Sequence, residues 1–211
     1  IPNNNDQPDQ LHQRSDSPIR SARSRAVLAV NSELVNLYWS LGRLISERQA
    51  VDGWGTKVVE RLASDLRREF PGMTGLSQRN LLYMRSFSAA WPDRAIVQQL
   101  VAQLPWGHNL QLLSKLDDPE LRRWYAAQAI EHGWSRAVLE NQIMSQLHLR
   151  QGVAPSNFAE LLPAADSELM QQVTKDPYNL EFLTLERQVA ERDLEAALVA
   201  HVQEFLLELG H

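Results

Sequence analysis

Apolar residues recur every three or four positions along most of the chain, the spacing that gives a helix one buried face. The first such stretch extends from Leu34 to Ile45, and it predicts a helix over about residues 20–50 that ends before Asp52-Gly53. No segment alternates apolar and polar residues in the way a half-buried strand does. Leu and Ala number 53 against 24 for Val, Ile and Thr, a ratio that also favours helix. The expected fold is therefore an all-α, multi-helix bundle.

Capping residues, Gly and Pro divide the rest of the chain into further helices. Thr56 begins a second helix, and Ser77 caps a third that ends before Trp91-Pro92. The pattern then predicts helices over about residues 93–104, 107–116, 119–132, 135–150 and 185–209.

The predicted helices suggest a plan of four segments. Residues 1–18 are polar, contain three prolines and are expected to form a disordered arm, because they offer little surface to bury. A helical module follows over residues 19–150. Residues 151–177 are expected to be a linker, and residues 178–211 contain the last helix.

Charge is distributed unevenly along this plan. The net charge is -5, yet residues 1–159 have a balance of +3 and residues 160–211 a balance of -8, which suggests a change of domain near the end. The absence of cysteine excludes disulfide frameworks and thiolate metal sites. No apolar run reaches the length of about 18 residues that a membrane span requires, so we expect a cytoplasmic protein without membrane contact.

Residues 56–87 have the layout of a helix-turn-helix, in which the second helix meets nucleic acid with its N-terminal end. On a helical wheel that starts at Ser77, Leu81, Met84 and Phe87 lie on one face, and polar residues lie on the opposite face. Arginine there can bind phosphates or base edges, although a solvated arginine face is an equally ordinary arrangement. The residues predicted to bind nucleic acid are Arg67, Arg68, Gln78, Arg79 and Arg85.

Glu191 and Glu195 lie four residues apart on the last predicted helix, so their carboxylates share a face. Such a pair can hold a divalent cation or act in acid–base chemistry, but it can equally form ordinary ion pairs with Arg187 and Arg192. The six histidines are scattered and form no helical zinc pair, so no metal site is expected from the residues alone.

Several long strings together resemble the YhcG-type family of bacterial nucleases, in the order in which that family has them. They are LYWSLGRLISERQ (37–49), GWGTKVVERLASDLRREFPGMTGLSQRNLLYMRSF (53–87), LPWGHNLQLLSKL (104–116), WYAAQAIEHGWSRAVLENQI (124–143) and KDPYNLEFLTLERQVAERDLEAALVAHVQEFLLELG (175–210). The resemblance implies an N-terminal helical module followed by a PD-(D/E)XK nuclease domain that cuts nucleic acid with Mg²⁺.

In that family an ELG segment leads into strands that carry the metal-binding Asp and the Glu-x-Lys pair, whereas this sequence stops at His211. The resemblance therefore implies that the last helix begins a truncated α/β nuclease domain. It nominates Glu195 as a catalytic acid, with Glu191 second. We expect no cofactor in this chain and no cleavage by it alone, with Mg²⁺ belonging to the complete family protein.

The predicted function is nucleic-acid binding or targeting, with DNA as the expected partner, for a nuclease core that the sequence lacks. The alternative is a helical dimerisation or partner-docking module that makes no direct contact with nucleic acid, and a homo-oligomer fits that alternative. A third hypothesis is a residual enzyme that uses Glu191 and Glu195.

Overall fold

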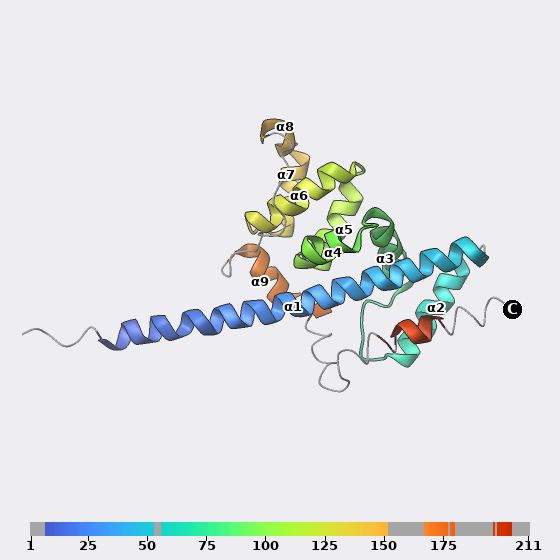
Figure 1. Ribbon diagram of the computed structural model, residues 1–211, viewed down its shortest axis with the longest axis horizontal. Helices are drawn as coiled ribbons and strands as arrows, with labels where there is room; N and C mark the ends of the chain where they lie inside the picture. Colours follow the sequence, from blue (N-terminus) through green and yellow to red (C-terminus); the bar gives the residue numbers. More distant parts are fainter. Residues whose placement is uncertain are drawn as a thin grey trace, which may run out of the picture.

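The structure is a computed structural model that describes residues 7–52, 56–151, 167–176, 178–179, 196 and 198–203, with side chains in the first helix from residue 21 to 50 (Figure 1). Within these segments the chain is helical and contains no strand, which confirms the all-α fold. The elements are α1 (Gln7–Asp52), α2 (Thr56–Glu69), α3 (Gln78–Ala90), α4 (Arg94–Gln99), the 3₁₀ turn η1 (Val101–Gln103), α5 (Trp106–Lys115), α6 (Pro119–Glu131), α7 (Arg136–Met144), α8 (Leu147–Gln151) and α9 (Glu168–Lys175).

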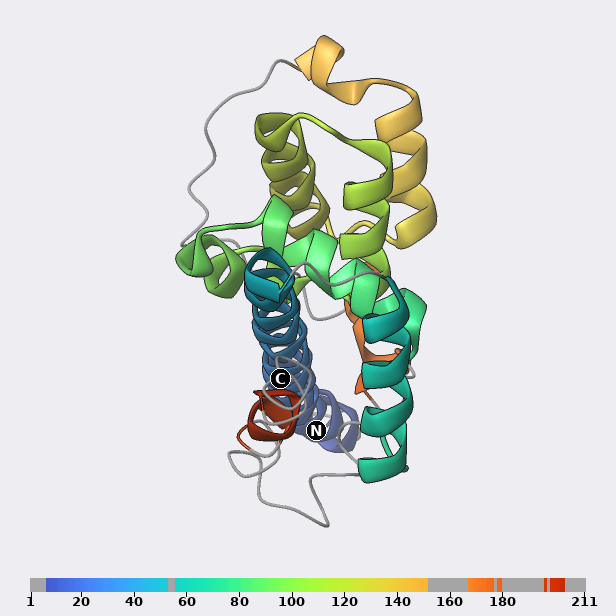
Figure 2. The same ribbon diagram turned by 90° about the vertical axis from the view of Figure 1, so that its right-hand side faces the viewer.

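Helix α1 is the axis of the molecule. Figure 2, which looks nearly along α1, shows α6, α7 and α8 above it, with α2 on one flank and residues 198–203 on the other. The predicted apolar stripe is confirmed, since Leu34, Tyr38, Leu41 and Ile45 are all buried. The expected disordered arm is wrong for residues 7–18, because α1 already begins at Gln7. Once a helix is nucleated, each further residue adds a hydrogen bond, so α1 extends beyond its packed part.

Helix α3 packs lengthwise on α1 with the face predicted from the wheel, and Leu81, Met84 and Phe87 are fully buried. The two backbones approach most closely at Gly42, where an added Cβ would collide with the carbonyl group of Met84. A glycine is therefore required at this point of α1 for steric reasons.

Two predicted helices are interrupted. The helix expected over residues 93–104 divides into α4 and η1, and buried side-chain amides bind the free carbonyls at the end of this segment. Asn31 Nδ2 donates to the carbonyls of Ala102 (2.7 Å) and Leu104 (3.0 Å), and Asn109 Nδ2 donates to those of Val101 and Leu104. The helix expected over residues 135–150 divides into α7 and α8 at Gln146, whose φ of 51° is left-handed.

The expected linker contains a helix. Ser167 Oγ accepts from the amide of Met170 and caps α9, which buries Leu169, Met170 and Val173. The segment expected to be a linker, residues 151–177, therefore includes a short amphipathic helix with its own cap and apolar face. Residues 152–166 lie outside the described part of the chain.

The C-terminal segment packs on the helical module. Asn179 Nδ2 donates to Asn31 Oδ1 at 3.1 Å, and both side chains are buried. Leu198 and Val202 belong to the same hydrophobic core as α1. Residues 196 and 198–203 are helical, in agreement with the predicted last helix, and the remainder of 185–209 lies outside the described residues.

We predict that Gly42→Ala lowers the free energy of unfolding by about 3 kcal/mol or more, because the methyl group must push α1 away from α3. Urea denaturation followed by circular dichroism measures this. Gly107→Ala is the matched control, since the nearest side-chain atom to its added Cβ is 3.5 Å away, and it should stay within about 1 kcal/mol of the wild type. Equal stability of the two variants would show that the helices can separate without cost.

Asn31→Ala should destabilise the protein by about 2 kcal/mol, because it removes the Asn31 donor to the buried carbonyl of Ala102 and one of two hydrogen bonds at both the Leu104 carbonyl and the Asn179 amide. A double-mutant cycle with Asn179→Ala measures the link to the C-terminal segment, and we expect a coupling energy of about 1 kcal/mol. Strictly additive effects of the two substitutions would mean that the contact does not join the segments energetically.

Candidate nucleic-acid interface

The first turn of α3 is fixed by side chains on both sides. Ser77 Oγ accepts from the amide of Asn80 at 3.2 Å, as the sequence predicted for an N-cap. Asn80 Nδ2 donates to the carbonyl of Gly75 (2.6 Å), and its Oδ1 accepts from the indole of Trp106 (2.8 Å). Gly75 adopts a φ of 85°, which glycine tolerates best. The start of α3 therefore has one defined position relative to the core.

The connection between α2 and α3 runs over residues 70–77 and is longer than the three or four residues typical of a helix-turn-helix. The pair has the predicted order of two helices joined by a Gly- and Pro-containing turn. Its use as a DNA-reading helix-turn-helix stays a prediction.

The two arginines predicted on α3 bind neutral groups. The guanidinium of Arg79 lies over the ring of Tyr83, 5.5 Å from the ring centroid, and its Nη2 donates to the Tyr83 hydroxyl at 3.0 Å. Arg85 Nη1 donates to Gln49 Oε1 on α1 at 2.7 Å. Arg79 is exposed, whereas Arg85 and Gln78 are half-buried. Both arginines are thus held in place with their positive charge available.

The arginines at the end of α2 differ from each other. Arg67 Nε donates to the carbonyl of Ala63 at 3.0 Å. Arg68 forms an ion pair with Asp65 (2.6 Å), although 77% of its side chain is exposed. An exposed ion pair of this kind contributes little to stability. Of the four predicted arginines, Arg68 is the one whose charge a neighbouring carboxylate partly neutralises.

Glu195 and Glu191, the acids nominated on the last helix, lie outside the residues that the structure describes. Within the described ranges no group of three or more His, Asp or Glu side chains is placed to hold a metal ion. None of the helices described is long and apolar enough to cross a membrane.

Sequence reasoning missed a cavity of about 540 Å³ where α5 and α7 meet α9. His108 and Arg136 line it from the module, and Gln172 and Lys175 line it from α9. His108 is fully buried, and its Nε2 lies 3.0 Å from the carbonyl of Trp134. A carbonyl can only accept, so Nε2 carries the proton of the neutral ring. The sequence feature that could have pointed to this cavity is the Pro105-Trp106-Gly107 segment, which interrupts the helical pattern directly before His108.

Burial, opposed by the hydrogen bond to Trp134 and assisted by the nearby charge of Arg136, lowers the pKa of His108 to about 4. The ring is therefore neutral at physiological pH. This arrangement suits a structural histidine at the edge of the cavity.

Comparison with known proteins gives two family matches and one curated relative. Residues 15–150 match the DUF1016 N-terminal domain, and residues 171–211 match the YhcG PDDEXK nuclease domain. The protein called "Putative nuclease YhcG" from Escherichia coli (strain K12) is 31% identical over 237 aligned residues, which cover 95% of this chain. The chain spans 62% of the length of that relative. No solved structure matches.

The neutral state of His108 predicts a pH dependence of stability. Because the folded pKa, about 4, lies below the unfolded value of 6.5, the unfolded chain takes up the proton first as the pH falls. The contribution is complete above about pH 6.5 and is lost between there and about pH 4, with a total of about 3 kcal/mol. Urea denaturation of wild type and His108→Gln across this window measures it. An identical pH slope in the two proteins would contradict the prediction.

Proposed function

The chain belongs to the YhcG-type nuclease family, and we propose that its helical module binds nucleic acid, with DNA as the expected form, for the family's nuclease domain. The observation that carries the proposal is the set of arginines on α2 and α3. Arg67, Arg79 and Arg85 are held by neutral groups, so a phosphate can take the place of a counter-ion.

The proposed mechanism is electrostatic docking of α3. Arg79 and Arg85 would bind phosphates, and Gln78 in the first turn could reach a base edge. Each phosphate contact displaces counter-ions from the nucleic acid, so binding should weaken steeply with salt. Since the Ser77–Asn80 anchors fix the start of α3, its side chains are presented with little loss of conformational freedom.

We propose nucleic-acid cleavage for the complete family protein, which contains the whole nuclease domain. The nuclease-domain match covers residues 171–211, and Glu195 within it is our candidate for a catalytic acid. Mg²⁺ is the expected cofactor of a PD-(D/E)XK domain, where it would activate water and stabilise charge on the phosphate. The role of the described residues is to bind and position the nucleic acid.

A second candidate function is self-association or partner docking. Met144 and Leu149 flank the α7–α8 corner and are 68% and 70% exposed, which is unusual for large apolar side chains. Leu82, which the sequence placed on a polar face, gives less support, because it is half-buried against the core.

The experiment is equilibrium binding of the chain to duplex DNA over a range of salt concentrations. We expect Arg79→Gln with Arg85→Gln to weaken binding and to reduce the log–log salt slope by about 2, one for each phosphate contact. Arg150→Gln is the control, since Arg150 is an exposed arginine on α8, distant in sequence from the α2–α3 pair, that donates to Ser145.

Two results would reject the docking mechanism: no binding by the wild type, or equal salt slopes for wild type and the double variant. Light scattering over a concentration series distinguishes the second candidate. A tight oligomer that Met144→Ser dissociates, without DNA affinity, would favour self-association.

A further inference from the structure

A second cavity, of about 410 Å³, lies where the turn between α3 and α4 meets the start of α6. Its apolar wall includes Trp91, Ile96 and Pro119, and its polar residues include Arg122 and Arg123. The cavity lies apart from the α3 residues proposed above for DNA docking. It combines apolar walls with a few polar groups, which is typical of ligand sites.

Arg122 is a buried cation at this cavity, with 7% of its surface exposed. Its Nε and Nη2 donate to the carbonyl of Leu116 at 3.2 and 2.7 Å, and Nη2 also donates to that of Asp117. Nη1 is 3.5 Å from the carbonyl of Ala90, the outer limit of a hydrogen bond. Among the described residues no carboxylate lies within ion-pair distance of this guanidinium.

Two more N–H groups of cavity-lining residues have no acceptor in the described part of the molecule. They are the indole Nε1 of Trp91 and the Nε of Arg123. Trp91 is 3% exposed, and the guanidinium of Arg122 lies over its ring, 5.8 Å from the centroid. A buried donor without a partner costs free energy, and an acceptor group bound here would recover it.

Two acids also line the cavity, but they leave the charge of Arg122 undercompensated. Asp93 Oδ1 accepts from the amide of Ala95 at 2.8 Å and serves as the cap of α4. Asp117 is exposed to solvent. Burial lowers the pKa of Arg122, and the charges of Asp117 and Asp118 offset this only in part. The charged form of Arg122 would therefore gain from an anion in the cavity.

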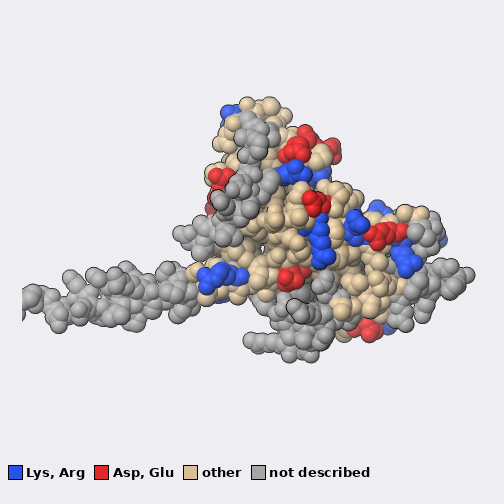
Figure 3. Space-filling model, viewed as in Figure 1, with Lys and Arg blue, Asp and Glu red and all other residues tan. Residues whose placement is uncertain are grey.

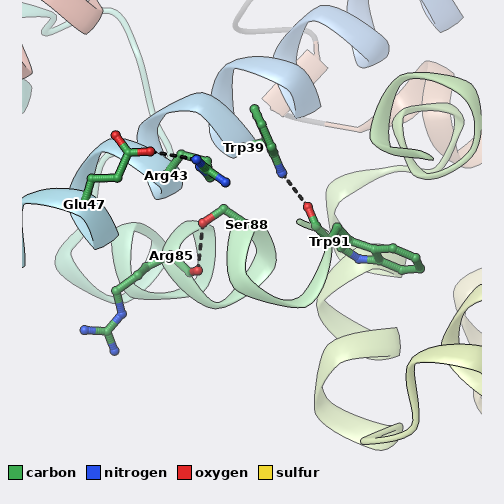
Figure 4. A network of polar contacts seen from close by, with 6 residues as sticks. All are labelled: Trp39, Arg43, Glu47, Arg85, Ser88 and Trp91. Carbon is green, nitrogen blue, oxygen red and sulfur yellow. Dashed lines mark hydrogen bonds and ion pairs between the residues drawn. The ribbon is translucent and has the colours of Figure 1, made fainter. Parts of the chain in front are cut away.

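Two further arginines contact Trp39, the α1 residue that is hydrogen-bonded to the cavity residue Trp91. Trp39 Nε1 donates to the carbonyl of Trp91 at 2.7 Å, which joins the two tryptophans (Figure 4). Arg43 and Arg94 lie over the ring of Trp39, 5.5 and 5.9 Å from its centroid. Arg43 also pairs with Glu47. On the face of the molecule drawn in Figure 3, Lys and Arg side chains are spread across the middle, with acidic side chains between them.

We propose that this cavity binds a phosphate group of a nucleic-acid strand, with Trp91, Arg122 and Arg123 as hydrogen-bond donors. Arginine and indole N–H groups all donate, which suits an oxyanion that only accepts. The choice of nucleic acid as the source of the phosphate rests on the proposed function. A strand bound here would contact the module at a second place besides α3.

The test follows the indole N–H signals of the six tryptophans by nuclear magnetic resonance. Trp91→Phe identifies the Trp91 signal, and the signal of Trp106, a buried tryptophan whose indole is bonded to Asn80 and which does not line the cavity, is the control. The probes are inorganic phosphate and a short duplex oligonucleotide, the form of DNA used to test docking by α3. We expect both to shift the Trp91 signal, and we expect Arg123→Gln to weaken both affinities about tenfold, while Arg150→Gln leaves them unchanged.

The outcomes separate this inference from the proposed function. If the oligonucleotide binds wild type and Arg123→Gln equally and leaves the Trp91 signal in place, the cavity proposal is wrong while docking by α3 stands. If phosphate shifts the signal but the oligonucleotide does not, the cavity is an anion site and its assignment to nucleic acid is wrong. If neither probe shifts the signal, the cavity binds no phosphate.

Discussion

The buried amide of Asn31 is the constraint on which much of the architecture depends. An amide in the core must satisfy its donors and its acceptor within the protein. Asn31 does so by binding carbonyls of residues 102 and 104 and by accepting from Asn179. It thereby holds the η1 segment against α1 and joins the C-terminal segment to the same helix.

That geometry determines which charges are available for function. With α3 tightly packed on α1 at Gly42, Arg85 reaches Gln49 across the helix pair, whereas Arg79 remains within its own helix on Tyr83. On the opposite side of the α3–α4 turn, Arg122 is bound to carbonyls in the core. The same rigid bundle thus presents two sets of arginines, one at its surface and one in a cavity.

The features that the sequence predicts well are local ones. Ser77 caps α3 where expected, because a cap requires only the residues that follow it, and Asp118 and Ser135 cap α6 and α7 in the same way. The contacts of residues 101–104 could not be predicted from the local pattern, since Asn31, which binds their carbonyls, lies 71 residues away from Ala102. The predicted face of α3 is also correct, but the partners of Arg79 and Arg85 depend on packing. Nothing in the sequence around Arg122 distinguishes it from an arginine on a solvated helix face, so its burial could not be predicted.

The contact between Asn31 and Asn179 crosses from one family match to the other, that is, from residues 15–150 to residues 171–211. Leu198 and Val202 complete the same core from the far side of that boundary. The boundary between the two family matches is therefore not a boundary between two separate hydrophobic cores. If the module were grafted with a boundary at residue 150, Asn31 Oδ1 would lose the hydrogen bond that Asn179 donates, and the core surface covered by Leu198 and Val202 would be exposed. The transferable unit therefore extends to at least residue 202.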